Sequence, residues 1–201
     1  MAFITIEGSD GSGKSTLATL IKEYFHRSQI NGVFTREPGG TKLGEELRAL
    51  ILNYKMTCLT ELFLYEAARA EHVETVIVPA LKSGVHVICD RFIHSSLAYQ
   101  GAGRGISSHL IHQLNTAATG GLEPDLVIWL TITPEKALER LHSRASEKNR
   151  FDAESKSFHD VVYRSFCEMA AADPRFISLD AGQSPSQVFA SLLSQPRWKT
   201  I

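Results

Sequence analysis

The segment that most constrains the fold is a glycine-rich loop near the start of the chain. Residues 8–15 read GSDGSGKS and satisfy the pattern GxxxxGK[ST], directly after the apolar run 3–6 and directly before a helical pattern. Glycines permit positive φ angles, so the loop can turn its backbone N–H groups inward, and the following helix adds the positive end of its dipole. The loop is therefore predicted to bind a polyphosphate.

Individual loop positions have expected roles. Lys14 is predicted to bridge the terminal phosphates, and the Ser15 hydroxyl is predicted to bind Mg²⁺. Asp10 is a carboxylate among anions, so it is expected to face either the metal ion or a hydroxyl of a second substrate. The expected nucleotide-binding residues are Gly8, Ser9, Asp10, Gly11, Ser12, Gly13, Lys14, Ser15 and Thr16.

Short β-branched runs alternate with longer helical patterns along the chain. The runs cover residues 3–6, 33–35, 85–88, 126–130 and 176–179. Apolar residues at helical spacing mark residues 14–30, 60–82, 134–142 and the stretch around 158–169. This alternation predicts an α/β fold, with a five-stranded parallel sheet flanked by helices. A length of 201 residues with no repeat or long linker predicts a single domain over 1–201.

Composition narrows the class of protein. The formal net charge is −1, which argues against a protein that binds nucleic acid through its overall field. No stretch is apolar enough to span a bilayer, and the N-terminal sequence MAFITIEG lacks the basic flank of a signal peptide. Cys58, Cys89 and Cys167 have no metal-ligand spacing and are expected to be reduced packing residues. We therefore expect a cytoplasmic protein with no membrane or nucleic-acid partner.

Two further predicted strands end in charged residues. Asp90 and Arg91 follow the buried run 85–88, at the edge where open α/β sheets bind ligands. The Asp90 carboxylate suits Mg²⁺ binding or activation of an attacking oxygen, and the Arg91 guanidinium suits a bidentate contact with a phosphate. Arg36 and Glu37 end the second run, where a proline-glycine turn can direct them to the same edge.

Taken together, these motifs closely resemble those of bacterial thymidylate kinases. Besides the loop, the resemblance rests on REPGGT at 36–41, YEAAR at 65–69, DRF at 90–92, YQGAGRGI at 99–106 and PDL at 124–126. The motifs follow the family's order and extend over nearly the whole chain. The resemblance implies a three-layer P-loop NTPase fold and a homodimer. It also implies transfer of the γ-phosphoryl group of ATP to thymidine 5′-monophosphate (dTMP), with Mg²⁺, to give dTDP for dTTP synthesis.

The resemblance assigns residues to the phosphate and sugar of the acceptor. Arg36 and Arg91 are expected to hold the phosphate, and Asp10 the sugar 3′-hydroxyl. Tyr99 is expected to pack against the sugar, where its ring would exclude a ribose hydroxyl at C2′. Ser95 and Tyr99 share a face of the helix after Arg91.

The resemblance also assigns residues to the base. Tyr65 is expected to stack on the face of the base, although the family commonly has phenylalanine there, and Arg69 and Ser96 are expected at its edge. Tyr65 and Arg69 are four residues apart, so they share one helix face. The full expected substrate-binding set is Asp10, Arg36, Glu37, Tyr65, Arg69, Arg91, Ser95, Ser96, Tyr99, Gln100 and Arg104.

A charged segment at about 143–153 is expected to form a mobile lid, because it lacks apolar periodicity. Phosphoryl transfer needs a cation on the moving group, and the loop position where some family members carry an arginine is Gly11 here. The basic residues Arg140, Arg144, Lys148 and Arg150 resemble the lid of the bacterial subgroup that lacks the loop arginine. The expected catalytic set is Lys14, Asp90, Arg91, Arg144 and Arg150, with Ser15 and Asp90 as the metal ligands.

Two alternatives remain open at this point. The same scaffold can serve another acceptor, such as a deoxynucleoside or a different nucleoside monophosphate, and a nucleotide-dependent switch would also retain the loop. Arginines in separate motifs, at Arg36, Arg69, Arg91 and Arg104, favour an enzyme, because a switch has no second phosphate to hold.

Overall fold

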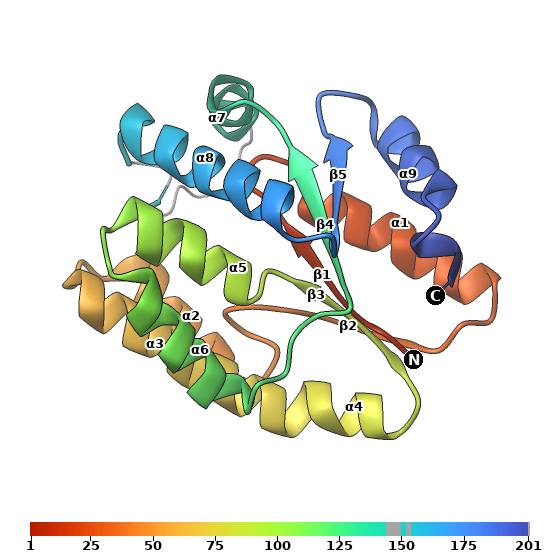
Figure 1. Cartoon of the computed structure of the whole chain (residues 1–201), viewed down its shortest axis with the longest axis horizontal. Helices are drawn as coiled ribbons and strands as arrows, with labels where there is room; N and C mark the ends of the chain where they lie inside the picture. The colour runs from red at the N-terminus through yellow and green to blue at the C-terminus, as the bar shows by residue number, and fades with distance from the viewer. Residues whose placement is uncertain (144–149, 152–153, 201) are drawn as a thin grey trace.

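The computed structural model describes residues 1–143, 150–151 and 154–200, and Figure 1 shows a central sheet between layers of helices. The strands are β1 (Phe3–Glu7), β2 (Gly32–Arg36), β3 (His86–Asp90), β4 (Leu126–Thr131) and β5 (Phe176–Asp180). All neighbouring strands are parallel, in the order β2-β3-β1-β4-β5. The predicted α/β class and the five predicted strands are confirmed, with every boundary within two residues.

The helices alternate with the strands. They are α1 (Lys14–Arg27), α2 (Lys42–Asn53), α3 (Cys58–His72), α4 (Val78–Lys82), α5 (Ile93–Ser96), α6 (Ser108–Thr119), α7 (Pro134–His142), α8 (Lys156–Ala172) and α9 (Pro185–Ser194). Two π-helical segments, η1 (Val73–Ile77) and η2 (Leu97–Gly103), continue α3 into α4 and extend α5, and a 3₁₀ turn, η3 (Trp198–Thr200), follows α9. The helix predicted at 60–82 is therefore one helical rod that contains a π-helical segment.

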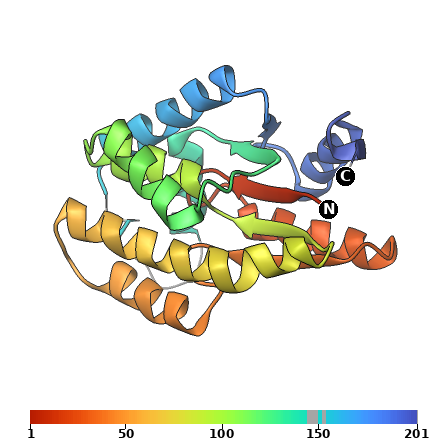
Figure 2. The same cartoon turned by 60° about the horizontal axis from the view of Figure 1, so that its bottom comes forward.

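Helices α2 and α9 were not predicted, because their signals are local caps rather than long apolar patterns. The Thr41 side chain caps α2 by accepting from the N–H of Gly44, a glycine that interrupts the helical pattern. Helix α9 begins with a capping box between Ser184 and Gln187 and is only 10 residues long. Figure 2 shows α2 on the outer side of the α3–α4 rod, away from the sheet.

The sheet separates two cores because side chains along each strand alternate between its faces. Ile4 and Ile6 of β1 pack in one core with residues of α1 and α9. Phe3 packs on the opposite face with η1 and with Phe92, which follows β3. Glu7, at the end of β1, points to this second face and is fully buried. A carboxylate therefore lies inside the molecule at the carboxyl edge of the sheet.

The strand register brings the predicted site segments together. Asp90 is the register partner of Ile6 in β1 and of Arg36 in β2. The glycine loop after β1, the turn after β2 and the turn after β3 therefore meet at one edge. None of the helices in the part of the chain that the structure describes is long and apolar enough to cross a membrane.

Candidate active site

The glycine loop closes around a lysine. Lys14, the first residue of α1, donates from its ammonium group to the backbone carbonyls of Gly8 (2.9 Å) and Ser9 (2.8 Å). The three glycines of the loop all have positive φ, as predicted. Burial, with a smaller contribution from Arg91, lowers the pKa of Lys14 to about 8. The loop thus holds a buried ammonium group against its own backbone carbonyls.

Gly11 lies against the backbone of α7. Its φ is 80°, and a Cβ atom at this position would overlap the carbonyl oxygen of Ala137. A side chain would therefore collide with a helix backbone and strain the loop. The loop has no room for an arginine at this position.

Two cavities flank the loop. The outer cavity is lined by Gly11, Ser12, Gly13 and Thr16 together with residues of α7, α9 and the connection after β5, among them Arg140, Ala181 and Gln183. Arg140 is fixed there, because its guanidinium donates to the carbonyl of Ala181 (2.7 Å). The inner cavity is strongly polar and is lined by Asp10, Gly11, Gly13, Lys14, Ser15, Arg36, Glu37, Arg48, Asp90 and Arg91.

Ser15 and Asp90 face each other across the inner cavity. The Ser15 hydroxyl donates to Asp90 Oδ2 over 3.4 Å. The second oxygen, Asp90 Oδ1, is buried and has no hydrogen-bond partner among the described residues. A hydroxyl and an orphaned carboxylate oxygen are hard oxygen ligands of the kind that Mg²⁺ prefers. The two residues predicted as metal ligands therefore fit that ion.

Arg91 connects the glycine loop to the helix that follows β3. Its guanidinium donates to Asp10 Oδ1 (2.8 Å), to Ser95 Oγ (3.1 Å) and to the Tyr99 hydroxyl (3.3 Å). Burial alone would raise the pKa of Asp10, but Arg91 and Lys14 together lower it to about 2. The sequence predicted that Asp10 faces a metal ion or a hydroxyl; its contact with Arg91 was not predicted.

Glu7 is a site residue that the sequence analysis missed. Its Oε1 accepts from the backbone N–H of Phe92 (2.8 Å), and its Oε2 accepts from the Ser95 hydroxyl (2.6 Å). Burial raises the pKa of Glu7 to about 7, against the opposing effects of Ser95 and Arg91. The available signal was an acidic residue at the end of a buried strand, immediately before the loop.

A pocket opens beside Arg91, on the face of the sheet away from α1. Nine of the predicted substrate-binding residues line it: Asp10, Glu37, Tyr65, Arg69, Arg91, Ser95, Ser96, Tyr99 and Gln100. The other lining residues were not predicted: Pro38, Arg48, Leu52, Phe92 and Phe151. Arg48 lines both this pocket and the inner cavity, and its guanidinium donates to the carbonyl of Pro38 (3.0 Å). It was missed because its helix, α2, was missed.

Arg69, another residue that lines this pocket, is fixed by hydrogen bonds. Its Nε donates to Glu37 Oε2 (2.8 Å), and its Nη1 donates to Glu66 Oε1 (2.7 Å), Ser96 Oγ (3.0 Å) and Asn115 Oδ1 (2.7 Å). Burial alone would lower the pKa of Arg69, but the two carboxylates raise it. The guanidinium therefore stays charged, and its orientation is set before any ligand arrives.

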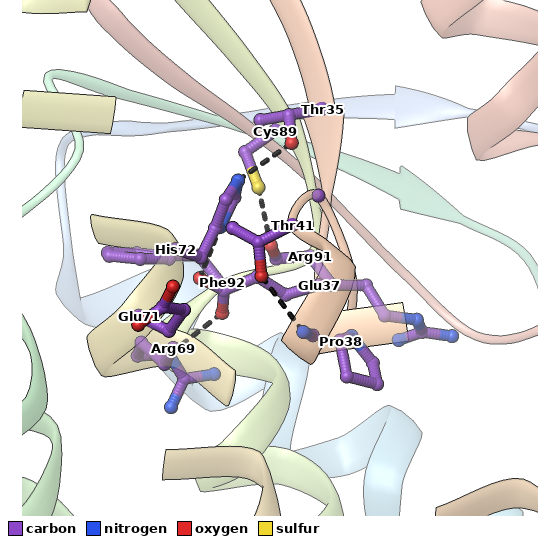
Figure 3. A network of polar contacts seen from close by, with 12 residues as sticks. Thr35, Glu37, Pro38, Thr41, Arg69, Glu71, His72, Cys89, Arg91 and Phe92 are labelled. Carbon is purple, nitrogen blue, oxygen red and sulfur yellow. Dashed lines mark hydrogen bonds and ion pairs between the residues drawn. The ribbon is translucent and has the colours of Figure 1, made fainter. Parts of the chain in front are cut away.

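His72 extends this network toward β2, as Figure 3 shows. Its Nδ1 lies 3.0 Å from Glu37 Oε1, and its Nε2 lies 2.7 Å from the Thr35 hydroxyl. Glu37, His72 and Cys89 bring potential metal-ligand atoms within 4.8 Å of one another. Both imidazole nitrogens are occupied by hydrogen bonds, and Arg69 contacts the same carboxylate. We therefore interpret the trio as a hydrogen-bond network and not as a metal centre.

Two residues of the predicted substrate-binding set, Arg36 and Arg104, do not line this pocket. Arg36 is exposed and pairs with Glu45 (2.8 Å), although it reaches the inner cavity. Arg104 pairs with Glu154 (2.7 Å) and with Glu61 (3.3 Å), and its guanidinium stacks on Phe158.

Arg150 is bound to the buried carboxylate of Glu61 (2.6 Å) and to the carbonyl of Ile51. Arg144 and Lys148 lie outside the described residues, as does most of the predicted lid.

Comparisons with known proteins agree with this geometry. The family model described as thymidylate kinase matches residues 6–192. The thymidylate kinase of Synechococcus sp. (strain JA-3-3Ab) is 52% identical over 194 residues, which is 96% of this chain and 93% of the relative. That of Desulfovibrio desulfuricans is 45% identical and covers 92% and 90%. The crystal structure of thymidylate kinase from Ehrlichia chaffeensis matches with a TM-score of 0.78 and 34% identity, over 96% of each chain.

The matched region contains the glycine loop, the arginine-lined pocket and the turn that carries Asp90 and Arg91. Identity of this extent over nearly the full length of both chains, together with the same arrangement of the sheet and helices, identifies the chain as a member of the thymidylate kinase family.

Proposed function

We propose that this enzyme transfers the γ-phosphoryl group of ATP to dTMP, giving dTDP and ADP for dTTP synthesis. The observation that carries the proposal is the pocket that contains both Arg91 and the fixed Arg69, directly beside a phosphate-binding loop. A switch would need the loop alone, whereas a pocket beside the loop with aromatic walls and a fixed guanidinium suits a nucleoside monophosphate.

The donor side of the proposal rests on the loop and its two cavities. The loop N–H groups and Lys14 would hold the ATP phosphates in the inner cavity. The outer cavity, lined by Thr16 and Arg140, would take the adenosine part. Ser15 and Asp90 would hold Mg²⁺, which neutralises charge on the phosphates when it is bound.

The acceptor phosphate would lie on Arg91. Arg36 and Arg48, which also reach the inner cavity, add charge near the same point. Asp10 stays ionised beside Arg91 and would accept from the sugar 3′-hydroxyl. These residues would orient the acceptor oxygen toward the donor phosphates, so that proximity contributes to the rate.

The base would occupy the end of the pocket formed by α3 and η2. Tyr65 would stack on the base, while Arg69, Ser96 and Gln100 present polar atoms to its edge. Because four acceptors already fix the Arg69 guanidinium, binding the base costs little further ordering. Tyr99 would lie against the sugar and exclude a 2′-hydroxyl.

We also propose that residues at about 143–153 act as a lid that supplies the arginine for the transition state, through Arg144 or Arg150. The crowding at Gly11 supports this, since the loop cannot carry the arginine itself. Arg150 is held by Glu61, so it would have to exchange this partner to reach the transferred group.

A homodimer is a further proposal, supported by exposed apolar side chains on α2, α3 and the segment between them. Outside Met1, the large exposed apolar residues among those described are Leu43, Leu50, Tyr54, Leu59 and Phe63. Exposed apolar side chains gathered on adjacent helices typically mark an interface. Light scattering should give twice the monomer mass, and Phe63→Glu should shift the protein toward the monomer. A monomeric parent protein would contradict the proposal.

The cytoplasm is the proposed compartment, because the donor ATP is made there and the three cysteines are free. The proposed activity is tested by measuring ADP formation with dTMP, dUMP, dGMP and thymidine as acceptors. We expect dTMP to give the highest kcat/KM. Acceptor-independent hydrolysis alone would favour a switch, and a preference for dGMP or thymidine would reassign the pocket.

A further inference from the structure

A chain of hydrogen bonds runs from Glu7 through Ser95 to Arg91. It ends at the pocket beside Arg91, where the acceptor is proposed to bind and which is called the acceptor pocket below. The Ser95 hydroxyl donates to Glu7 Oε2 over 2.6 Å, and Arg91 Nη1 donates to the same Ser95 oxygen over 3.1 Å. Glu7 is absent from the residues that line the acceptor pocket and the inner cavity. The Glu7 carboxylate therefore does not line the pocket itself, but it contacts Ser95, which does.

The two oxygens of the Glu7 carboxylate contact different parts of the segment that follows β3. Arg91 has φ of 73°, in the left-handed region that a residue with a side chain rarely adopts. Its own N–H donates to the carbonyl of Ile6 (3.0 Å), and the next N–H, that of Phe92, donates to Glu7 Oε1 (2.8 Å). The end of β1 thus fixes both peptide N–H groups around the strained residue.

The second carboxylate oxygen sets the direction of the Ser95 hydroxyl. A serine has one hydrogen to donate, and at 2.6 Å this hydrogen points to Glu7. The lone pairs of Ser95 are then free to accept from Arg91 Nη1. An amide nitrogen in place of Oε2 would donate to Ser95, which would leave the serine hydrogen without this acceptor and disturb the support of the guanidinium.

We propose that Glu7 is a positioning residue for the acceptor phosphate, holding the Arg91 backbone through Phe92 and the Arg91 guanidinium through Ser95. This inference rests on the proposed function, in which Arg91 binds the phosphate of dTMP. Arg91 and Lys14 favour the ionised form of Glu7, but burial outweighs them and raises its pKa to about 7. The support for the proposal is therefore geometric: one carboxylate oxygen accepts from Phe92 and the other from Ser95.

The test compares kcat, the KM for dTMP and the KM for ATP in the parent protein, Glu7→Gln, Ser95→Ala and the double variant. The matched control is Thr5→Val, which changes a buried residue on the same face of β1 whose hydroxyl has no hydrogen-bond partner among the described residues. Glu7→Gln should raise the KM for dTMP about 10- to 100-fold, the range for losing a hydrogen bond to a charged group, with the KM for ATP within about twofold. Thr5→Val should leave both values near those of the parent.

The double variant tests the route through Ser95. If Glu7 supports the guanidinium through this serine, the double variant should raise the KM for dTMP by less than the product of the two single effects. A multiplicative effect would remove Ser95 from the route and overturn the proposal in this form. So would a Glu7→Gln protein whose KM for dTMP equals that of Thr5→Val, or whose two KM values rise together.

If Glu7→Gln does not fold, the same KM values are measured for Glu7→Asp. It retains the charge but shortens the reach by one methylene, so we expect a smaller rise in the KM for dTMP in the same direction. An unchanged KM for dTMP in a folded Glu7→Asp protein would overturn the proposal. A parent protein that does not phosphorylate dTMP would instead overturn the proposed function.

Discussion

Arg91 Nη2 and Asp10 Oδ1 lie 2.8 Å apart, so the arginine of the acceptor pocket is bonded directly to the phosphate-binding loop. The contact joins a residue that follows β3 to one that follows β1, at the edge where both strands end. A phosphate bound to Arg91 would therefore lie next to the loop proposed to hold the donor. This contact explains why a carboxylate is tolerated in an anion-binding loop: its charge is balanced by a fixed guanidinium.

The Arg91→Ala and Lys14→Ala variants should lose binding of different nucleotides. Arg91→Ala removes the contact with the acceptor phosphate, so we expect dTMP binding to weaken about 100-fold or more, while ATP affinity stays within about twofold. Lys14→Ala removes the counter-charge of the donor phosphates and should weaken ATP binding instead. Both variants should lose turnover. Calorimetry with each nucleotide separates the two, and normal dTMP affinity in Arg91→Ala would refute the assignment.

The lid arginines should act on turnover more than on binding. Arg144→Ala or Arg150→Ala should lower kcat about 10²- to 10⁴-fold, with a smaller change in dTMP affinity, as expected for cations that contact the transition state. Glu61→Gln is a useful companion, because it frees Arg150 from its carboxylate partner without removing the cation. If both alanine variants keep the kcat of the parent, the lid is only a cover.

Tyr99 should determine the choice between deoxyribose and ribose. Its ring lies under the Arg91 guanidinium at 5.0 Å and lines the pocket, so a 2′-hydroxyl would lose water without gaining a good partner. That cost of roughly 1–3 kcal/mol corresponds to about 10- to 100-fold discrimination. The ratio of kcat/KM for dUMP and UMP should fall in Tyr99→Ala and persist in Tyr99→Phe, which keeps the ring. An unchanged dUMP/UMP ratio in Tyr99→Ala would show that Tyr99 only packs in the structure and does not select the sugar.

His94 should make the protein less stable as the pH falls. It is buried edge-on to Phe176, its Nδ1 has no hydrogen-bond partner among the described residues, and burial together with Arg175 lowers its pKa to about 4. The pKa of His94 in the folded protein lies below its unfolded value of 6.5. The part of the unfolding free energy that depends on a neutral His94 is therefore complete above pH 6.5 and is lost as the pH falls toward 4. This loss of unfolding free energy amounts to about 3 kcal/mol.

Urea unfolding at several pH values checks this prediction. Between pH 6.5 and 4, the parent protein should lose more unfolding free energy than His94→Phe, which keeps an aromatic ring but cannot bind a proton. Equal losses in the two proteins would assign the acid sensitivity to other groups.

The features that the sequence predicted are those with local signals. The loop of residues 8–15 fixes its own backbone through its glycines, and the β-branched runs mark the strands. Tyr65 and Arg69 could be placed on one pocket wall, because four residues along a helix return to the same face. The parallel sheet followed from strands separated by helices.

The features that it missed depend on contacts between distant parts of the chain. Glu7 meets Phe92 and Ser95, which lie 85 and 88 positions away, and nothing next to Glu7 in the sequence indicates these partners. Arg48 was missed because the glycine at position 44 interrupts the pattern of α2. Arg104 has the expected residue type, but the carboxylates of Glu61 and Glu154 hold it outside the pocket lining.

In the proposed reaction, one phosphoryl group moves from the donor on the loop to the acceptor on Arg91. The most direct measurement uses ATP labelled at the γ-phosphorus, with dTMP and Mg²⁺, and follows the label by chromatography of the nucleotides. We expect the label to appear in dTDP at the rate at which ADP forms, and we expect this transfer to disappear in Arg91→Ala. Label released as inorganic phosphate, with dTMP unchanged, would contradict it.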